Sequence, residues 1–477
     1  MSSQERHRCF SKILWAVEKL QGRVNYPQFE AIADVIIQTM TGPWRFFHTP
    51  EHIFEVGGEE DPIEVLAALF HDLVYVQVDT GMNINICRYL APYVYDREGQ
   101  LWLADTPPTD QLLELVIAIF GFEKRQPLLP FHGQNEFLSA LVCLRSLADI
   151  LSLSQLAEIC ACIEATIPFR GKTASGDATG YIIEQTPSDL LELRLVGVNS
   201  QFGFGWHRQK ITAIVQRAVR VANRDVGNFA SPSSARFLDN TWNLLPETNH
   251  DLTYVNSYTV QDYRRSLEKM EGFMNFLNPE LVFRQYAEEP PTPTYQQMLQ
   301  ATEHNLQVAR LYLGAKLVAI AIIEALSQSI GREVPLSTMM GELPQEAHNR
   351  EPVALEQFLP SLPTPKIDSP LEQEVLELLE KGRTAHSSYD VKHSPVATFL
   401  VKSLGFARVR SLLPVAKKLF RGHLSYQEFL HHIEPAVVNQ IITATLQLFD
   451  QRRNLLSSLL ERSTLSPATN SRNQVAH

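Results

Sequence analysis

The chain has 477 residues, of which 44% are hydrophobic and 20% are charged, so it can form a large folded core. Its 42 Lys and Arg residues against 53 Asp and Glu residues give a net charge of −11, which disfavours a nucleic-acid-binding protein. Five scattered cysteines argue against a disulfide framework, and the polar N-terminus lacks an apolar signal segment. We therefore expect a soluble cytoplasmic protein.

Apolar residues recur at spacings of three and four through the N-terminal half, which predicts an all-α fold. Alternation with a period of two is rare: residues 74–78 form a short candidate strand, and residues 252–258 a small strand or a loop. The predicted helices span residues 10–20, 26–39, 63–73, 110–120, 136–151, 156–167, 188–196 and 206–226.

Two proline-rich stretches, 288–295 and 331–370, divide the chain. Between them, residues 295–329 predict one long helix. Its most apolar part, 311–326, contains Lys316 and Glu324 and is too short to span a bilayer, so we expect a buried helix and no membrane association. These boundaries predict a helical domain over 1–287, a bridging helix and Pro-rich linker over 288–370, a C-terminal helical domain over 371–462 and a disordered tail over 463–477.

The chain contains two His-Asp pairs, and about one is expected by chance at ordinary residue frequencies. His250-Asp251 lies in a polar loop, whereas His71-Asp72 ends the apolar helix IEVLAALFHDL. An imidazole and a carboxylate at the end of a buried helix need partners, because burying either one unpaired costs several kcal/mol. A divalent cation is one such partner, and the alternative is that both residues are ordinary structural ones.

Upstream of His71, the segment RFFHTPEHIFEV places His48 and His52 four residues apart. Thr49 and Pro50 predict the start of a helix, so the two imidazoles project to the same side at its N-terminus. Together with His71 and Asp72, they supply three candidate metal ligands and one spare imidazole. This set suits zinc, iron, manganese or cobalt better than calcium.

The segments FHTPEHI (47–53) and LFHDLVY (69–75) resemble the HD-domain superfamily of metal-dependent phosphohydrolases, especially a bacterial branch with a YHTLEHI-like start and an FHD-x-VY core. The H-x-x-x-H spacing is also similar to the HN-x-x-H signature of cyclic-nucleotide phosphodiesterases. The resemblance covers about residues 44–230 and implies an HD-like helical core. It implies His48 as general acid and His52, His71 and Asp72 as metal ligands.

The resemblance also implies one further aspartate ligand on a downstream helix. Asp225, in AVRVANRDVGNFA, resembles the family's A-D-x-x-N pattern and continues the apolar face of the predicted helix 206–226. The alternative is a solvated acid at a helix end. Weaker alternatives for the ligand are Asp149, Asp177 and Asp189.

The sequence departs from the family pattern where two-metal members have a further histidine. Ala165-Thr166 is followed by IPFR, and the acidic residue expected after Tyr75 is displaced to Asp79. His132 and His207 could replace the missing histidine, although a structural role explains each more simply. A one-metal site and a decayed site therefore both stay open, as does Mg at a second site.

The resemblance implies a metal-dependent phosphohydrolase that uses Mn, Fe, Zn or Co to activate water against a nucleotide or other small phosphoester. Asp72 could also accept the proton of that water. Arg45 could bind the substrate phosphate, with Arg170 and Lys172 as weaker candidates. The alternatives are a catalytically decayed HD-fold protein that binds nucleotide or regulates, and a helical scaffold. In the scaffold, the C-terminal helices would form a homo-oligomer or contact a protein partner.

Overall fold

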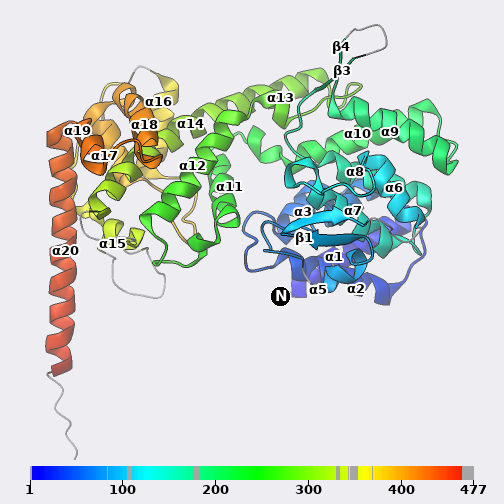
Figure 1. Cartoon of the computed structure of the whole chain (residues 1–477), viewed down its shortest axis with the longest axis horizontal. Coiled ribbons are helices and arrows are strands. Elements are labelled where there is room, and N and C mark those ends of the chain that lie inside the picture. The colour runs from blue at the N-terminus through cyan, green and yellow to red at the C-terminus, as the bar shows by residue number, and fades with distance from the viewer. Residues whose placement is uncertain are drawn as a thin grey trace, which may run out of the picture. The chain divides into compact units, whose positions relative to one another are not determined.

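The computed structural model describes residues 3–82, 84–104, 110–176, 182–328, 334–341, 343, 353–367 and 369–464. Helices dominate these residues and the strands form two short hairpins, so the prediction of an all-α fold is confirmed (Figure 1). Asp177 and most of the predicted tail (465–477) lie outside the described residues.

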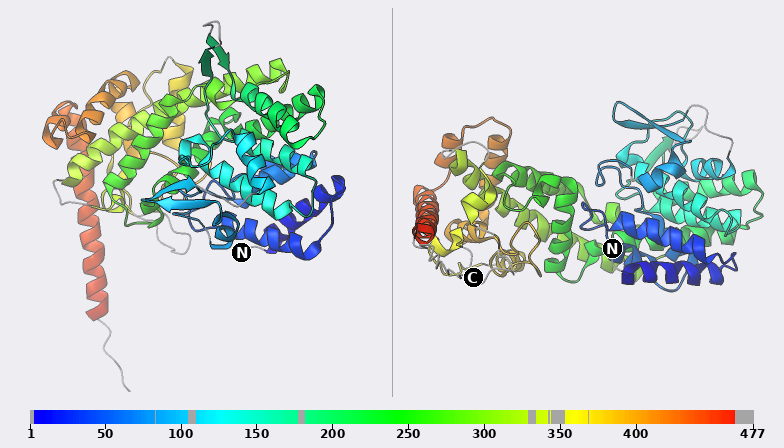
Figure 2. Two further views of the ribbon diagram at one scale, coloured as in Figure 1. Left: turned by 45° about the vertical axis from the view of Figure 1, so that its right-hand side comes forward. Right: turned by 90° about the horizontal axis from the view of Figure 1, so that it is seen from below.

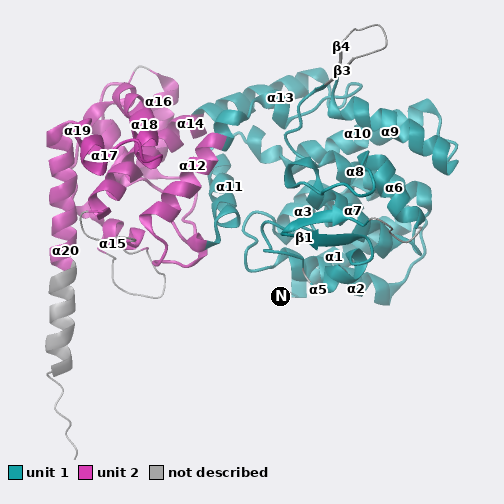
Figure 3. Ribbon diagram, in the orientation of Figure 1, with its two compact units in different colours: residues 1–250, 273–307 teal, residues 251–272, 308–477 magenta. Residues whose placement is uncertain are grey.

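The chain divides into two compact units (Figure 3). Unit 1 comprises residues 1–250 and 273–307, and unit 2 comprises residues 251–272 and 308–477. This division differs from the predicted domain limit at residue 287, because residues 251–272 belong to unit 2. Sequence periodicity marks where helices form but not which helices pack together, so it could not place this boundary.

Unit 1 contains a counterpart of each helix predicted for the N-terminal half. The hairpins were not predicted, and residues 74–78 form turns instead of a strand. Its helices are α1 (Ser3–Lys19), α2 (Tyr26–Met40), α3 (Pro50–Gly57), α4 (Pro62–Phe70), α5 (Ile84–Leu90), α6 (Gln111–Phe120), α7 (Gln134–Leu147), α8 (Leu153–Ala165), α9 (Pro187–Phe202), α10 (Arg208–Asp225), α11 (Ser234–Thr248) and α13 (Pro279–Val282). Its antiparallel hairpins pair β1 (Val94–Arg97) with β2 (Gln100–Leu103) and β3 (Thr173–Gly176) with β4 (Ile182–Gln185).

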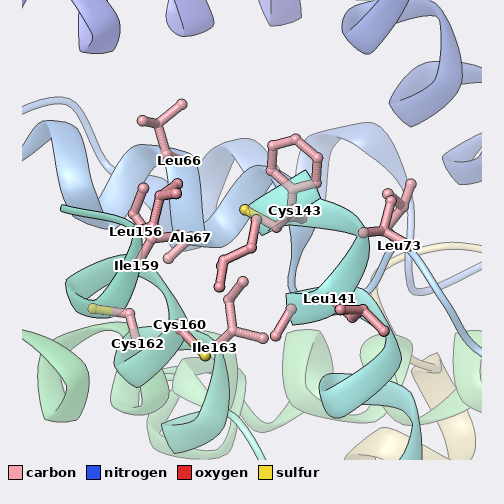
Figure 4. Packing of buried hydrophobic residues seen from close by; sticks show 14 of the residues in the cluster. Leu66, Ala67, Leu73, Leu141, Cys143, Leu156, Ile159, Cys160, Cys162 and Ile163 are labelled. Carbon is pink, nitrogen blue, oxygen red and sulfur yellow. The ribbon is translucent and has the colours of Figure 1, made fainter. Parts of the chain in front are cut away.

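The core of unit 1 is built around α4, which is buried on all sides from Ile63 to Phe70. Figure 4 shows Ala67 of α4 near Ile159 of α8, and these two helices pack against each other. Helix α8 also packs against α10, and α1 packs beside α2 (Figure 2). The same core therefore supports the ends of α4 and α10, where two of the sequence motifs lie.

Three cysteines, Cys143, Cys160 and Cys162, belong to this core. Burial raises the pKa of each thiol above its usual range, which keeps them protonated. All five cysteines of the chain are free. Cys160 and Cys162 are therefore part of the packing of unit 1.

Unit 2 consists of helices, and it includes the N-terminal part of one helix and the C-terminal part of another that also belong to unit 1. Helix α14 (Thr292–Gln328) is the one helix of the described residues that is long and apolar enough to cross a membrane, yet 83% of its most apolar window is buried. The prediction of a buried helix over 311–326 is thus confirmed. The other helices are α12 (Val260–Phe276), α15 (Leu336–Met340), α16 (Pro370–Lys381), α17 (Pro395–Leu404), α18 (Phe406–Phe420), α19 (Tyr426–His431) and α20 (Pro435–Thr464).

Gly133 precedes α7 with a φ of +90°, in the left-handed region, and a Cβ at this position would lie 2.3 Å from Cδ1 of Ile167. We expect Gly133→Ala to lower the free energy of unfolding by about 2 kcal/mol, because strain and overlap add. Urea denaturation of the full chain measures this change. The control is Gly197→Ala in α9, where a Cβ meets nothing within 4 Å. We expect this variant to raise the free energy of unfolding by about 0.5 kcal/mol, and equal effects of the two substitutions would contradict this expectation.

Candidate metal centre

The first pair of histidines lies at the start of α3, as predicted. Thr49 is the N-cap of this helix and Pro50 is its first residue. His48 therefore stands just outside the helix and His52 lies in its first turn. Their rings are 5.7 Å apart between centroids and meet edge to face, so both imidazoles occupy the same region.

The His71-Asp72 pair follows directly after α4, with His71 as its C-cap. Nδ1 of His71 lies 2.8 Å from the carbonyl oxygen of Ala68, to which it donates. This hydrogen bond fixes the ring and leaves Nε2 as the nitrogen available to a metal.

Asp225, the last residue of α10, completes a cluster of four side chains. Its Oδ1 lies 3.1 Å from Nε2 of His52 and 3.3 Å from Nε2 of His71. Oδ2 of Asp72 lies 2.9 Å from Nε2 of His71 and 3.4 Å from Nε2 of His52. One ligand atom from each of the four lies within 4.8 Å of all the others. The structure thus brings together all four predicted ligands.

This cluster fits a cation in its chemistry as well as its geometry. Oδ2 of Asp72 is buried and, in spite of its closeness to His71, no hydrogen bond of good geometry reaches it. Two imidazoles and two carboxylates form a donor set that suits divalent transition metals. His52, His71, Asp72 and Asp225 could therefore hold one metal ion.

Without a cation, the cluster balances its charges with protons. Burial opposes a charged His52, but its contacts with Asp225 and Asp72 outweigh that effect and raise its pKa to about 9. Burial likewise opposes a charged His71, yet Asp72 and Asp225 raise its pKa well above the ordinary value. Burial favours the neutral acids, but the nearby imidazoles hold the pKa of Asp72 and of Asp225 below their usual range. A metal ion must therefore compete with protons for this site.

A fifth residue, Glu247 near the end of α11, was not found from the sequence. Its Oε1 accepts hydrogen bonds from the backbone N–H groups of Phe46, Phe47 and His48, at 2.7, 2.7 and 3.0 Å. Its Oε2 lies 2.5 Å from Nδ1 of His48, and the side chain is only 1% exposed. Glu247 thus orients His48, whose Nε2 lies 4.0 Å from Oδ2 of Asp72.

Arg45 does not occupy the position that the sequence predicts for it. Its Nε and Nη2 pair with Asp79 at 2.8 and 2.6 Å, and its Nη1 donates to the carbonyl oxygen of Asp72 at 3.0 Å. The side chain is fully buried. These contacts occupy the guanidinium, so Arg45 supports the segment that carries Asp72 and is not placed to clasp a phosphate. The displaced acid Asp79 is its ion-pair partner.

The other candidates lie outside the cluster. Asp189 forms a capping box with Thr186 at the start of α9, and Asp149 is exposed. His207 caps α10 through a hydrogen bond from the backbone N–H of Lys210. Two more are exposed: His132, and Lys172, which lies 3.8 Å from Glu184.

Glu136, in the first turn of α7, is a second acid that sequence reasoning missed. Burial, with repulsion from Asp72 and Asp225, raises its pKa to about 8. Its Oε2 is buried, and among the described residues it has no hydrogen-bond partner. No local motif distinguishes Glu136 or Glu247 in the sequence, because each acts on residues far away along the chain.

Comparison with known proteins gives no match to a family model, to a curated protein or to a solved structure. The functional argument therefore depends on the residues and geometry of this chain.

Metal binding to the full chain should strengthen as the pH rises from 6 to 8. His52 has a raised pKa of about 9, so it holds a proton over this range and must release it to bind an ion. We expect the dissociation constant for Mn²⁺ or Zn²⁺ to fall about tenfold per pH unit for each proton displaced. Titration calorimetry in buffers of different ionisation enthalpy measures both affinity and proton release. An affinity that does not change with pH would contradict this account.

Proposed function

We propose that this protein is a metal-dependent phosphohydrolase of the HD type that acts in the cytoplasm on a nucleotide or another small phosphoester. The observation that carries the proposal is the meeting of His52, His71, Asp72 and Asp225 from three separate segments, with ligand atoms within 4.8 Å of one another. The resemblance of residues 47–53 and 69–75 to the HD superfamily supports the same assignment. These four residues would hold Mn, Fe, Zn or Co.

A divalent ion bound there would supply an acidified water molecule and neutralise charge on a phosphoryl group. The protein's own residues prepare the site for this chemistry. The carbonyl oxygen of Ala68 holds His71 with Nε2 directed at the cluster. Arg45, clamped by Asp79, holds the carbonyl oxygen of Asp72 and so fixes the turn after α4.

His48 would be the proton donor for the leaving oxygen, and its contacts support this role. Its Nδ1 is engaged by Glu247, which leaves Nε2 free to face the side of the site where Asp72 lies. An imidazole held in this way can transfer a proton through Nε2 without reorienting. This arrangement separates the roles of the histidines: His52 and His71 bind the ion, and His48 moves a proton.

His71→Ala and Asp225→Asn test the metal centre, because each removes one ligand. We expect bound metal to fall from about one ion per chain to near zero, and phosphoester turnover to fall at least about a thousandfold. Metal analysis of protein purified without chelator and a phosphoester panel measure these changes. A wild-type protein that binds metal but turns over no phosphoester would instead favour a binding or regulatory role. A wild-type protein without metal would refute the proposal.

Glu247→Gln tests the orientation of His48 without touching the metal ligands. The amide can still accept the backbone hydrogen bonds, but it cannot stabilise a charged imidazole. We expect turnover to fall about 10- to 100-fold with the metal content unchanged. Glu18→Gln, at an exposed position of α1, is the control for the loss of one acidic group. If both variants keep wild-type kcat, His48 does not need Glu247.

A further inference from the structure

A compact group of three arginines surrounds one buried glutamate at the end of α8. Nη1 of Arg170 and Nη2 of Arg194 lie 2.7 and 2.9 Å from Oε1 of Glu164. Arg284 donates to the carbonyl oxygens of Ala165 and Ile167 at 2.6 and 2.5 Å. Three guanidinium groups against one carboxylate leave two positive charges in excess. Such an excess in a partly buried place requires an anion nearby.

Hydrogen bonds link the arginine group to α10, the helix that carries Asp225. The backbone N–H of Arg284 donates to Oδ1 of Asn223 at 3.0 Å, and Nδ2 of Asn223 donates to the carbonyl oxygen of Arg284 at 2.8 Å. Asn223 is two residues from Asp225 on α10, so Arg284 is tied to the turn that carries a metal ligand. Burial and repulsion from Arg170 lower the pKa of Arg284 to about 9, while attraction to Glu164 and Asp225 opposes this shift.

Three buried polar atoms of these groups have no hydrogen-bond partner among the described residues. Nε of Arg170 is a donor without an acceptor, and Oε2 of Glu136 and Oε2 of Glu164 make no hydrogen bond. Glu136 interacts electrostatically with Arg170 on one side and with Asp72 and Asp225 on the other. A buried donor without an acceptor is costly, so a ligand with acceptor oxygens would be favoured here.

The charge balance indicates the class of ligand. A divalent ion would neutralise Asp72 and Asp225 and leave the excess of two positive charges on the arginine group. A terminal phosphate carries about −1.5 to −2 at pH 7, whereas a phosphodiester carries about −1. The monoester therefore matches the excess more closely.

We infer that Arg170, supported by Arg194 and Arg284, is the phosphate-binding side of the metal centre and takes the place of a second metal ion for a phosphomonoester substrate. This inference rests on the proposed function. It also gives a role to the sequence IPFR after Ala165-Thr166, which differs from the HD pattern. Arg170 ends this sequence, near the position where two-metal members have a further histidine. A guanidinium can supply both charge and directed donors to phosphoryl oxygens.

Binding of inorganic phosphate to the full chain loaded with Mn²⁺ tests the inference independently of turnover. We expect one metal ion per chain, and Arg170→Gln should weaken phosphate binding at least about tenfold with that metal content unchanged. Arg23→Gln, at an exposed position, is the control for the lost charge and should bind phosphate like the wild type. Equal affinity in Arg170→Gln and wild type, or a second ion that phosphate binding requires, would overturn the inference.

Arg170→Lys covers the case in which Arg170→Gln does not fold, because lysine retains a cation beside Glu164. We expect this variant to unfold at a temperature near that of the wild type. Its affinity for phosphate should be at least about threefold lower than that of the wild type. Unchanged binding in a folded Arg170→Lys would count against the inference. If the Arg170 variants lose phosphate binding but the wild type hydrolyses no ester, the proposed hydrolysis is refuted and the phosphate site is sustained. Faster turnover of diesters than monoesters would overturn the substrate class.

Discussion

Two partly buried carboxylates that share the same pair of imidazoles impose the main constraint on unit 1. Asp72 and Asp225 repel each other, and His52 and His71 stand between them within about hydrogen-bonding distance. Such a group is stable only where positive charge is supplied, by protons or by a metal ion. The surrounding fold must therefore hold three chain segments against that repulsion. Most of the polar contacts near the site can be understood as meeting this requirement.

The alignment of α10 with α4 shows how the scaffold does so. Arg217 pairs with Asp61 at 2.7 Å, Arg220 with Glu64 at 2.8 Å and Arg224 with the same glutamate at 2.5 Å. These arginines recur at spacings of three and four on one face of α10, so they fix its register along α4. Because Asp225 follows Arg224 directly, this ladder of ion pairs also fixes the fourth ligand.

The sequence could predict those parts of the site that depend on local structure. Thr49-Pro50 sets the start of α3, and the apolar run before His71 sets the end of α4, so both motifs fall where the periodicity places them. Asp225 was found because the resemblance implies a further aspartate ligand, and this residue also continues the apolar face of a predicted helix. The HD resemblance itself, and with it the reaction, stays a prediction.

Other features depend on contacts between distant residues, which periodicity does not encode. Glu247 binds backbone N–H groups about 200 residues away along the chain. Glu136 interacts electrostatically with Asp72 and Asp225, which lie on other segments of the chain. Arg45 had the right residue type in the right neighbourhood, but Asp79 binds it. The short hairpins and the boundary of unit 2 were missed for the same reason. Tertiary pairing determines these features, and one sequence carries little record of it.

Helices α4 and α10 both end at the cluster, and the negative ends of their dipoles face the same point. Each helix terminus acts as roughly half a negative charge, so the backbone adds about one unit to the two carboxylates. Protonated imidazoles balance the two carboxylates when no ion is bound, so the helix ends are what still disfavours an anion here until a cation is in place. The backbone itself thus favours a fixed order of assembly, in which the ion enters first and an anionic ligand follows. A chain that has lost its ion would then release its anion as well.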